Sequence, residues 1–238
     1  SDAVAGTQLV IEAIPEDVDL KRRLFQDLDK LCDPSVILAT NTSVISVSDI
    51  SSMARARHRI VGTHFWNPPY LIPLVEVVAG PDTDQKVVDA VLEILKSTGK
   101  RPVKVKQDVP GFIGNRLQHA LWREAISIVE SGIADPEDID DVVTHGFGLR
   151  LPVLGPLKNA DLVGLDLTFA IHDYLLPHIC SVPTPSQLLR QKVDVGEIGC
   201  KTGKGFYAWE PKDEEETKST LLNHLMTTTE VRDSFAYL

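Results

Sequence analysis

Arg59-Ile-Val-Gly-Thr-His-Phe65 and Leu74-Val-Glu-Val-Val-Ala79 are the two apolar runs that decide the fold of this chain. Their length and their β-branched residues predict buried strands. His64 stands at the end of the first strand, and Glu76 stands in the middle of the second. A carboxylate inside an apolar strand is costly to bury unless another group answers its charge. We therefore expect His64 and Glu76 to form a pair that takes and returns a proton near neutral pH.

Other strands and helices alternate around these two runs. The apolar pattern predicts further strands at Leu9–Ile14, Val36–Thr40 and Pro102–Lys106, and helices around residues 18–31, 46–54 and 87–99. This alternation favours βαβ units and a mostly parallel sheet. Such sheets bind ligands at the carboxyl ends of their strands, where Thr40-Asn-Thr-Ser43 and His64 fall.

The second half of the chain has a different character. Helical patterns cover Gly111–Ala134, Ile133–Val143 and Leu157–Ile179, and no comparable strand pattern follows. We therefore predict an α/β domain over residues 1–107, the carboxyl-terminal part of a Rossmann-like fold, and an all-α domain over residues 108–238.

Composition excludes several classes of protein. The 238 residues carry a net charge of -10 and no basic block, which argues against a nucleic-acid surface. No apolar stretch approaches the roughly 20 residues that span a bilayer. The cysteines, Cys32, Cys180 and Cys200, lack metal-ligand spacing, so we expect no metal site. An odd, sparse set of cysteines favours a reducing compartment, and we expect the protein in the cytoplasm.

One hallmark of a dinucleotide-binding fold is absent from the sequence. Such a fold opens with a strand, a G-x-G-x-x-G turn and a helix that hold the pyrophosphate. Gly146-Phe-Gly148 has Leu151 in place of the third glycine, and Gly203-Lys-Gly205 has Ala208. We expect that an amino-terminal segment of the nucleotide domain precedes Ser1. A separate polypeptide that supplies it is the alternative.

Seven motifs in order resemble the 3-hydroxyacyl-CoA dehydrogenase family. The motifs are Leu9-Val-Ile-Glu-Ala-Ile14, Asn41-Thr-Ser43, His64-Phe-Trp-Asn-Pro68, Leu74-Val-Glu-Val-Val78, Val109-Pro-Gly-Phe-Ile-Gly-Asn-Arg116, Gly155-Pro156 with Ala160-Asp-Leu-Val-Gly-Leu165, and Lys201-Thr-Gly-Lys-Gly-Phe-Tyr207. The resemblance implies NAD-dependent oxidation of the 3-hydroxy group of a 3-hydroxyacyl-CoA, such as 3-hydroxybutyryl-CoA, to the 3-keto product. It also implies a homodimer formed through the helical domain.

The resemblance assigns roles to individual residues. The family's catalytic positions fall on His64, Glu76, Ser43 and Asn115. Its positions around the nicotinamide nucleotide fall on Glu16, Lys21, Ser43, Asn67 and Lys201.

Chemistry supports these catalytic roles. Oxidation of an alcohol requires a base for the hydroxyl proton, and an imidazole oriented by a carboxylate supplies one. Ser43 and Asn115 offer neutral hydrogen bonds that fix the reacting oxygen.

Structural interpretations compete at several positions. A helix cap is the alternative interpretation of Ser43, and a solvated side chain is the alternative for Lys201. Glu12 favours a structural or supporting role, and Trp66 favours packing.

The segment Gly146–Pro156 bears on the substrate. It is longer than the glycine–proline turn usual in enzymes acting on CoA esters, and is similar to relatives that oxidise free hydroxy acids, L-gulonate 3-dehydrogenase (with lambda-crystallin) and carnitine dehydrogenase. Arg150 within it suits a two-pronged bond to a substrate carboxylate, or an ordinary surface or interface position. Three hypotheses follow: a 3-hydroxyacyl-CoA dehydrogenase, a dehydrogenase of a free 3-hydroxy acid, and a non-catalytic protein on the same scaffold.

Overall fold

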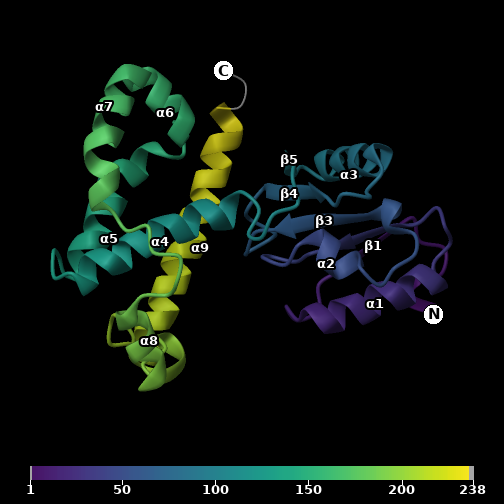
Figure 1. Ribbon diagram of the computed structural model, residues 1–238, viewed down its shortest axis with the longest axis horizontal. Coiled ribbons are helices and arrows are strands. Elements are labelled where there is room, and N and C mark those ends of the chain that lie inside the picture. The colour runs from purple at the N-terminus through teal and green to yellow at the C-terminus, as the bar shows by residue number, and fades with distance from the viewer. Residues whose placement is uncertain (1, 236–238) are drawn as a thin grey trace. The chain divides into compact units, whose positions relative to one another are not determined.

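The computed structural model describes residues 2–235 of the chain (Figure 1). The chain divides into two compact units, one built from residues up to 117 together with those from 221 onward, and one from residues 118–220. The domain limits expected from the sequence, 1–107 and 108–238, stay a prediction, and residues 236–238 lie outside the described part.

A five-stranded sheet forms the centre of the first unit. Its strands lie in chain order: β1 (Leu9–Glu12), β2 (Ile37–Thr40), β3 (Ile60–Phe65), β4 (Leu74–Ala79) and β5 (Arg101–Val105). Strands β1, β2 and β3 run parallel, β4 runs antiparallel to β3, and β5 runs parallel to β4. The mixed sheet with its helices confirms the predicted α/β class.

The short connection between β3 and β4 explains their antiparallel pairing. Residues 66–73 are too few for the crossover of a dozen or more residues that parallel neighbours need. The chain therefore turns back on itself, and the resulting register places His64 directly opposite Glu76. The sheet pairing thus brings together two residues that are twelve positions apart in the chain.

Helices cover both faces of the sheet (Figure 1). On one face, α1 (Val18–Leu31) and α2 (Val47–Ser51) build a core with Phe25, Leu38 and Ile50. On the other, α3 (Gln85–Ser97) packs Val88 and Val91 against β3 and β4. The short 3-10 helices in this unit are η1 (Asp2–Val4) and η2 (Arg57–Arg59).

Polar side chains fix the helix starts. Asp17 accepts the Leu20 N–H at 2.8 Å at the start of α1, and Ser46 accepts the Asp49 N–H at 3.1 Å at the start of α2. Asp108, from the segment after β5, accepts the N–H groups of Val47 and Ser48 at 2.9 and 2.7 Å. These bonds satisfy amide groups that have no partner within the helix.

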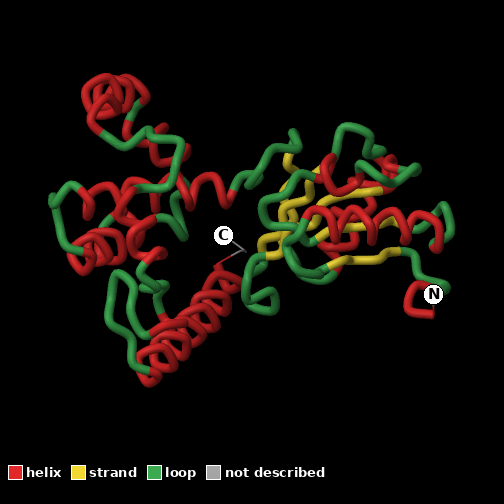
Figure 2. Tube along the Cα trace, turned by 60° about the horizontal axis from the view of Figure 1, so that its bottom comes forward, coloured by secondary structure: helices red, strands yellow, loops and turns green. Residues whose placement is uncertain are grey.

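The second half of the chain is helical, as predicted, and Figure 2 draws its helices in red with the yellow strands confined to the first unit. The helices are α4 (Gly114–Glu130), α5 (Pro136–His145), α6 (Pro156–Val163), α7 (Leu165–Leu175), α8 (Gln187–Asp194) and α9 (Pro211–Phe235), with 3-10 turns η3 (Phe147–Arg150), η4 (Leu176–His178) and η5 (Cys200–Thr202). The segment Leu157–Ile179 is helical as predicted, and it consists of separate helices rather than one continuous helix. Gly164, with a φ of 107°, separates α6 from α7, and Pro177 follows the end of α7.

Within the described residues, none of the helices has both the length and the apolar character required to cross a bilayer.

Candidate active site

His64 and Glu76 face each other across the β3–β4 pair. The His64 Nδ1 lies 2.8 Å from the Glu76 Oε2, and the two side chains are only 6% and 2% exposed. An ionised carboxylate only accepts hydrogen bonds, so Nδ1 carries the ring proton and Nε2 bears the free lone pair in the neutral ring. The arrangement provides an oriented proton acceptor.

The Glu76 carboxylate has three further donors. Its Oε1 accepts the N–H groups of Ile113 and Gly114 at 2.9 and 3.0 Å, and its Oε2 also accepts the indole N–H of Trp66 at 3.3 Å. Phe112, just before the two amides, has a φ of 48°, a left-handed conformation that a bulky residue rarely adopts. This strained residue directly precedes the pair of amides bound to Glu76, an association typical of a functional site.

These donors determine the protonation state of Glu76. Burial alone raises the pKa of a carboxyl group, but the bonds from His64, Gly114 and Ile113 outweigh it, so the pKa of Glu76 lies below its ordinary value. The carboxylate therefore stays ionised beside the imidazole.

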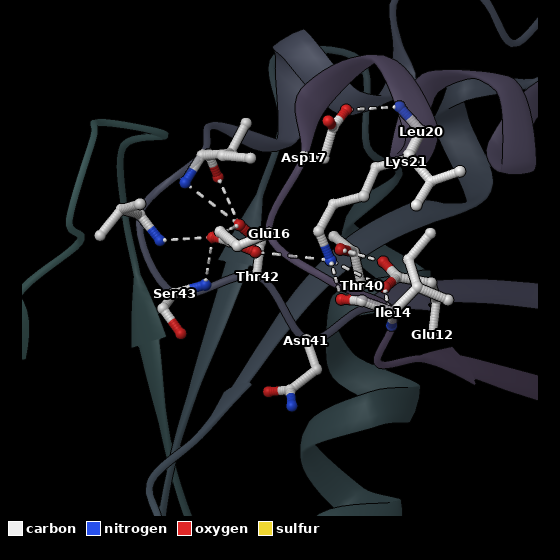
Figure 3. Close-up of polar contacts among 12 residues, drawn as sticks. Glu12, Ile14, Glu16, Asp17, Leu20, Lys21, Thr40, Asn41, Thr42 and Ser43 are labelled. Atoms are coloured by element: carbon white, nitrogen blue, oxygen red, sulfur yellow. Dashed lines mark hydrogen bonds and ion pairs between the residues drawn. The ribbon is translucent and has the colours of Figure 1, made fainter. Parts of the chain in front are cut away.

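A second carboxylate holds the turn after β2, as Figure 3 shows. The Glu16 Oε1 accepts the Thr42 hydroxyl at 2.6 Å and the N–H groups of Ser43 and Val44 at 2.9 and 3.1 Å. Burial raises the pKa of Glu16, but these bonds and the Lys21 charge outweigh it and lower the pKa below its ordinary value. The ionised Glu16 carboxylate therefore holds the turn that contains Ser43 in place by hydrogen bonds.

Lys21 is fully buried and bound to protein oxygens. Its ammonium lies 2.7 Å from the Glu12 Oε1, 3.3 Å from the Ile14 carbonyl oxygen and 3.5 Å from the Glu16 Oε2 (Figure 3). The other Glu12 oxygen accepts the Thr40 hydroxyl at 2.7 Å. These contacts fit the supporting role expected for Glu12. They also show that the Lys21 ammonium links two carboxylates, so its assignment to the nucleotide stays a prediction.

Amide side chains join the same region. The Asn115 Nδ2 donates to the Ser43 carbonyl oxygen at 2.8 Å, and the Asn41 Oδ1 accepts the Phe65 N–H at 2.9 Å. Ser43 itself is exposed, and the residue that caps α2 is Ser46. Asn67 is exposed just beyond β3. The structure thus brings Ser43 and Asn115 together through the main chain of Ser43.

Two predicted residues belong to the second unit. Arg150 ends η3 and Lys201 lies in η5, and both are exposed. Their roles toward substrate and cofactor stay predictions.

Sequence reasoning misses Trp66 and Phe112 as parts of the site. Trp66 is expected to pack only, yet its indole N–H donates to Glu76. Its position two residues after His64, just beyond the end of β3, is the available sequence signal. The left-handed backbone of Phe112 has no sequence signal, since such a conformation favours glycine.

The polar groups at these strand ends suit the nicotinamide portion of NAD. Glu16 keeps a partly exposed carboxylate, and Asn67 and Ser43 expose neutral polar groups, a mixture of acceptors and donors that fits ribose hydroxyls and a carboxamide. Among the side chains that the structure describes, those of residues 2–229, we find no group of three or more His, Cys, Asp or Glu that could hold a metal ion.

Comparisons with known proteins agree with this arrangement. A family model described as the NAD binding domain of 3-hydroxyacyl-CoA dehydrogenase matches residues 1–109, and one described as its C-terminal domain matches residues 111–209. A probable 3-hydroxybutyryl-CoA dehydrogenase of Bacillus subtilis is 39% identical over 86% of this chain and 70% of its own length.

Two other similar proteins have names that specify different substrates. An L-carnitine dehydrogenase of Streptomyces coelicolor is 45% identical over 68% of this chain and 51% of its own length. The crystal structure of 5-formyl-3-hydroxy-2-methylpyridine 4-carboxylic acid 5-dehydrogenase, described as NAD+ dependent, superposes with a TM-score of 0.90 and 35% identity, covering 97% of this chain and 74% of that one.

Glu76→Gln should weaken the acid dependence of stability. The pKa of Glu76 in the folded protein lies below the ordinary value of 4.5, so its ionised form stabilises the fold above that pH, and the stabilisation is lost as pH falls through the lower, folded value. The neutral amide lacks this titration. Urea midpoints measured from about pH 6 down to about pH 3 should therefore fall less steeply than in the unaltered protein.

Glu93→Gln provides the control, because Glu93 is an exposed glutamate on α3. This control should keep the original acid dependence. An equally steep loss of stability in Glu76→Gln would contradict the assignment of a lowered pKa.

Proposed function

Because the chain belongs to the 3-hydroxyacyl-CoA dehydrogenase family, we propose that it oxidises the 3-hydroxy group of a 3-hydroxyacyl-CoA to the 3-keto product, with His64 as the general base. The protein is an NAD-dependent oxidoreductase that acts on a CH–OH group. The observation that carries the proposal is the buried contact of 2.8 Å between His64 and Glu76.

His64 removes the hydroxyl proton of the substrate. The Nε2 lone pair accepts that proton while the C–H bond at carbon 3 breaks and its electron pair forms a hydride, so that the carbonyl group is left. Bound NAD supplies the acceptor for this hydride. The ionised Glu76 stabilises the imidazolium that results and holds its ring orientation.

The other predicted residues hold the reacting groups. The Ser43 hydroxyl hydrogen-bonds the substrate oxygen, and Asn115 fixes the Ser43 main chain and offers an amide to the same site. Glu16, Asn67 and Lys201 contact the nicotinamide nucleotide, and Lys21 contributes there through Glu16. The predicted boundary near residue 107 separates this nucleotide domain from the helical one.

A free carboxylic acid is the second candidate substrate. The structure superposes with a TM-score of 0.90 on the dehydrogenase whose name specifies a pyridine carboxylic acid. The sequence is 45% identical to the carnitine dehydrogenase over 68% of this chain. In this case the exposed Arg150 binds the substrate carboxylate with two parallel hydrogen bonds.

The helical half supports the proposal of a homodimer. None of the described side chains of α5 to α8 is buried, and Leu157, Phe169 and Tyr174 on α6 and α7 are 82%, 74% and 78% exposed. Apolar side chains exposed in such number favour burial against a second copy of the chain.

We also propose that the protein is located in the cytoplasm. The free thiols of Cys32, Cys180 and Cys200 suit such a reducing compartment.

His64→Gln should lower turnover strongly while substrate binding persists. The amide has no basic lone pair for the hydroxyl proton, and loss of a general base typically lowers kcat by about 100- to 10,000-fold. Reduction of NAD with 3-hydroxybutyryl-CoA measures the effect. His58→Gln, an exposed histidine in η2, should keep full activity. Unchanged turnover in His64→Gln would remove His64 from the reaction.

A substrate panel distinguishes the two candidate substrates. NADH formation with 3-hydroxybutyryl-CoA, L-gulonate and L-carnitine should be fastest with the CoA ester. If a free acid is the better substrate, Arg150→Met should lower kcat/KM for that acid about tenfold or more and spare the ester, since one charged hydrogen-bonding partner is lost. Activity with none of the three would contradict both substrate proposals.

Light scattering tests the homodimer. The protein should have twice the monomer mass at micromolar concentration, and Phe169→Asp, which places a charge among the exposed apolar side chains of α7, should shift it toward the monomer. A monomeric mass for the unaltered protein would overturn the proposal.

A further inference from the structure

Trp66 shares an acceptor atom with His64. Its indole Nε1 lies 3.3 Å from the Glu76 Oε2, the same oxygen that binds the His64 Nδ1 at 2.8 Å. The rings of Trp66 and His64 also contact each other, with 5.3 Å between their centroids. The tryptophan therefore touches both members of the pair.

Packing fixes the indole in this place. A Cβ atom added at Gly114 would lie 2.3 Å from the Trp66 Cζ2, so the indole rests directly on the main chain at the start of α4. The N–H of the same Gly114 donates to the other Glu76 oxygen at 3.0 Å. Gly114 thus leaves space for the Trp66 indole, and its N–H binds the Glu76 oxygen that the indole does not contact.

The shared oxygen has an electrostatic consequence. A carboxylate oxygen that accepts two hydrogen bonds carries less negative charge toward each donor, and a donor removed from it strengthens the remaining bond. The indole N–H competes with the imidazolium for Oε2 and so weakens the hold of Glu76 on the protonated ring. Loss of this donor should make His64 retain its proton to higher pH.

We propose that Trp66 is a positioning residue that tunes His64 through Glu76, lowering the pH at which the imidazole becomes free to accept a proton. The importance of this effect for the reaction rests on the proposed role of His64 as general base. Among the residues that the structure describes, Glu76 is the charged group in contact with the His64 ring, and its ring neighbours, Trp66 and Phe112, are neutral. Glu76 is therefore the charged group through which Trp66 can act on the His64 ring.

The test compares Trp66→Phe with the unaltered protein by two measurements. Phenylalanine keeps an aromatic ring but removes the N–H donor. NMR titration of the His64 ring, assigned through its loss in His64→Gln, should show a midpoint about half a pH unit higher, because Glu76 without the indole donor binds the protonated ring more strongly. The acid limb of kcat/KM should move upward by the same amount.

The two measurements separate the two proposals. An NMR midpoint that stays unchanged in Trp66→Phe overturns the inference about Trp66. A midpoint that rises while the acid limb stays in place supports the role of Trp66 and contradicts His64 as the base. A tryptophan that only packs would lower kcat without moving either midpoint, which also overturns the inference.

Two further variants guard against misfolding and indirect effects. Gly114→Ala retains the main-chain donor but displaces the indole, and should raise the His64 midpoint in the same direction if Trp66→Phe does not fold. Trp122→Phe is the matched control, because Trp122 lies half-exposed on α4 against His119. It should leave both midpoints unchanged, and a shift equal to that of Trp66→Phe would count against the specific contact.

Discussion

The buried Glu76 carboxylate is the group on which the structure around it depends. Desolvation of an ion costs several kcal/mol, so a carboxylate in the middle of an apolar strand is tolerated only with full hydrogen bonding. Here His64 and Trp66 donate from one segment, and the N–H groups of Ile113 and Gly114 donate from another. The antiparallel register of β3 with β4 and the left-handed turn at Phe112 both serve this one group.

A second ionic cluster plays the corresponding part at the ends of β1 and β2. Lys21 neutralises the buried Glu12 and lies close to Glu16, and Glu16 in turn holds the main chain of Ser43 and Val44. Asn115, at the start of α4, then binds the carbonyl group of Ser43. The two clusters therefore converge on the start of α4, since the residues just before Asn115 bind Glu76. A change in either cluster is expected to alter the position of Ser43 relative to His64.

Much of this arrangement follows from local sequence rules. The apolar runs of β1 to β5 are continuous enough to identify each strand, and the motif order indicates the family on which the assignments of His64 and Glu76 rest. The antiparallel pairing of β3 with β4 is also predictable from the sequence, because residues 66–73 are too few for the crossover that parallel strands need. The break at Gly164 was missed, since apolar content alone does not distinguish one helix from two.

Tertiary contacts account for what the sequence did not reveal. A lysine is usually a surface or ligand-binding residue. Lys21, however, lies four positions before Phe25 on the buried face of α1, where it forms an ion pair with Glu12. Trp66 looks like a packing residue until the indole N–H is placed against Glu76. Both depend on which segments meet in space, and local pattern does not specify that.

The central claim is that His64 and Glu76 act as one proton-accepting unit. The most direct measurement is a double-mutant cycle of kcat/KM for NAD reduction with His64→Gln, Glu76→Gln and the doubly substituted protein. Residues that act as a unit give grossly non-additive losses, so the account predicts that the double substitution costs about as much as His64→Gln alone. Losses that multiply, each substitution lowering the rate by its own full factor, would contradict it.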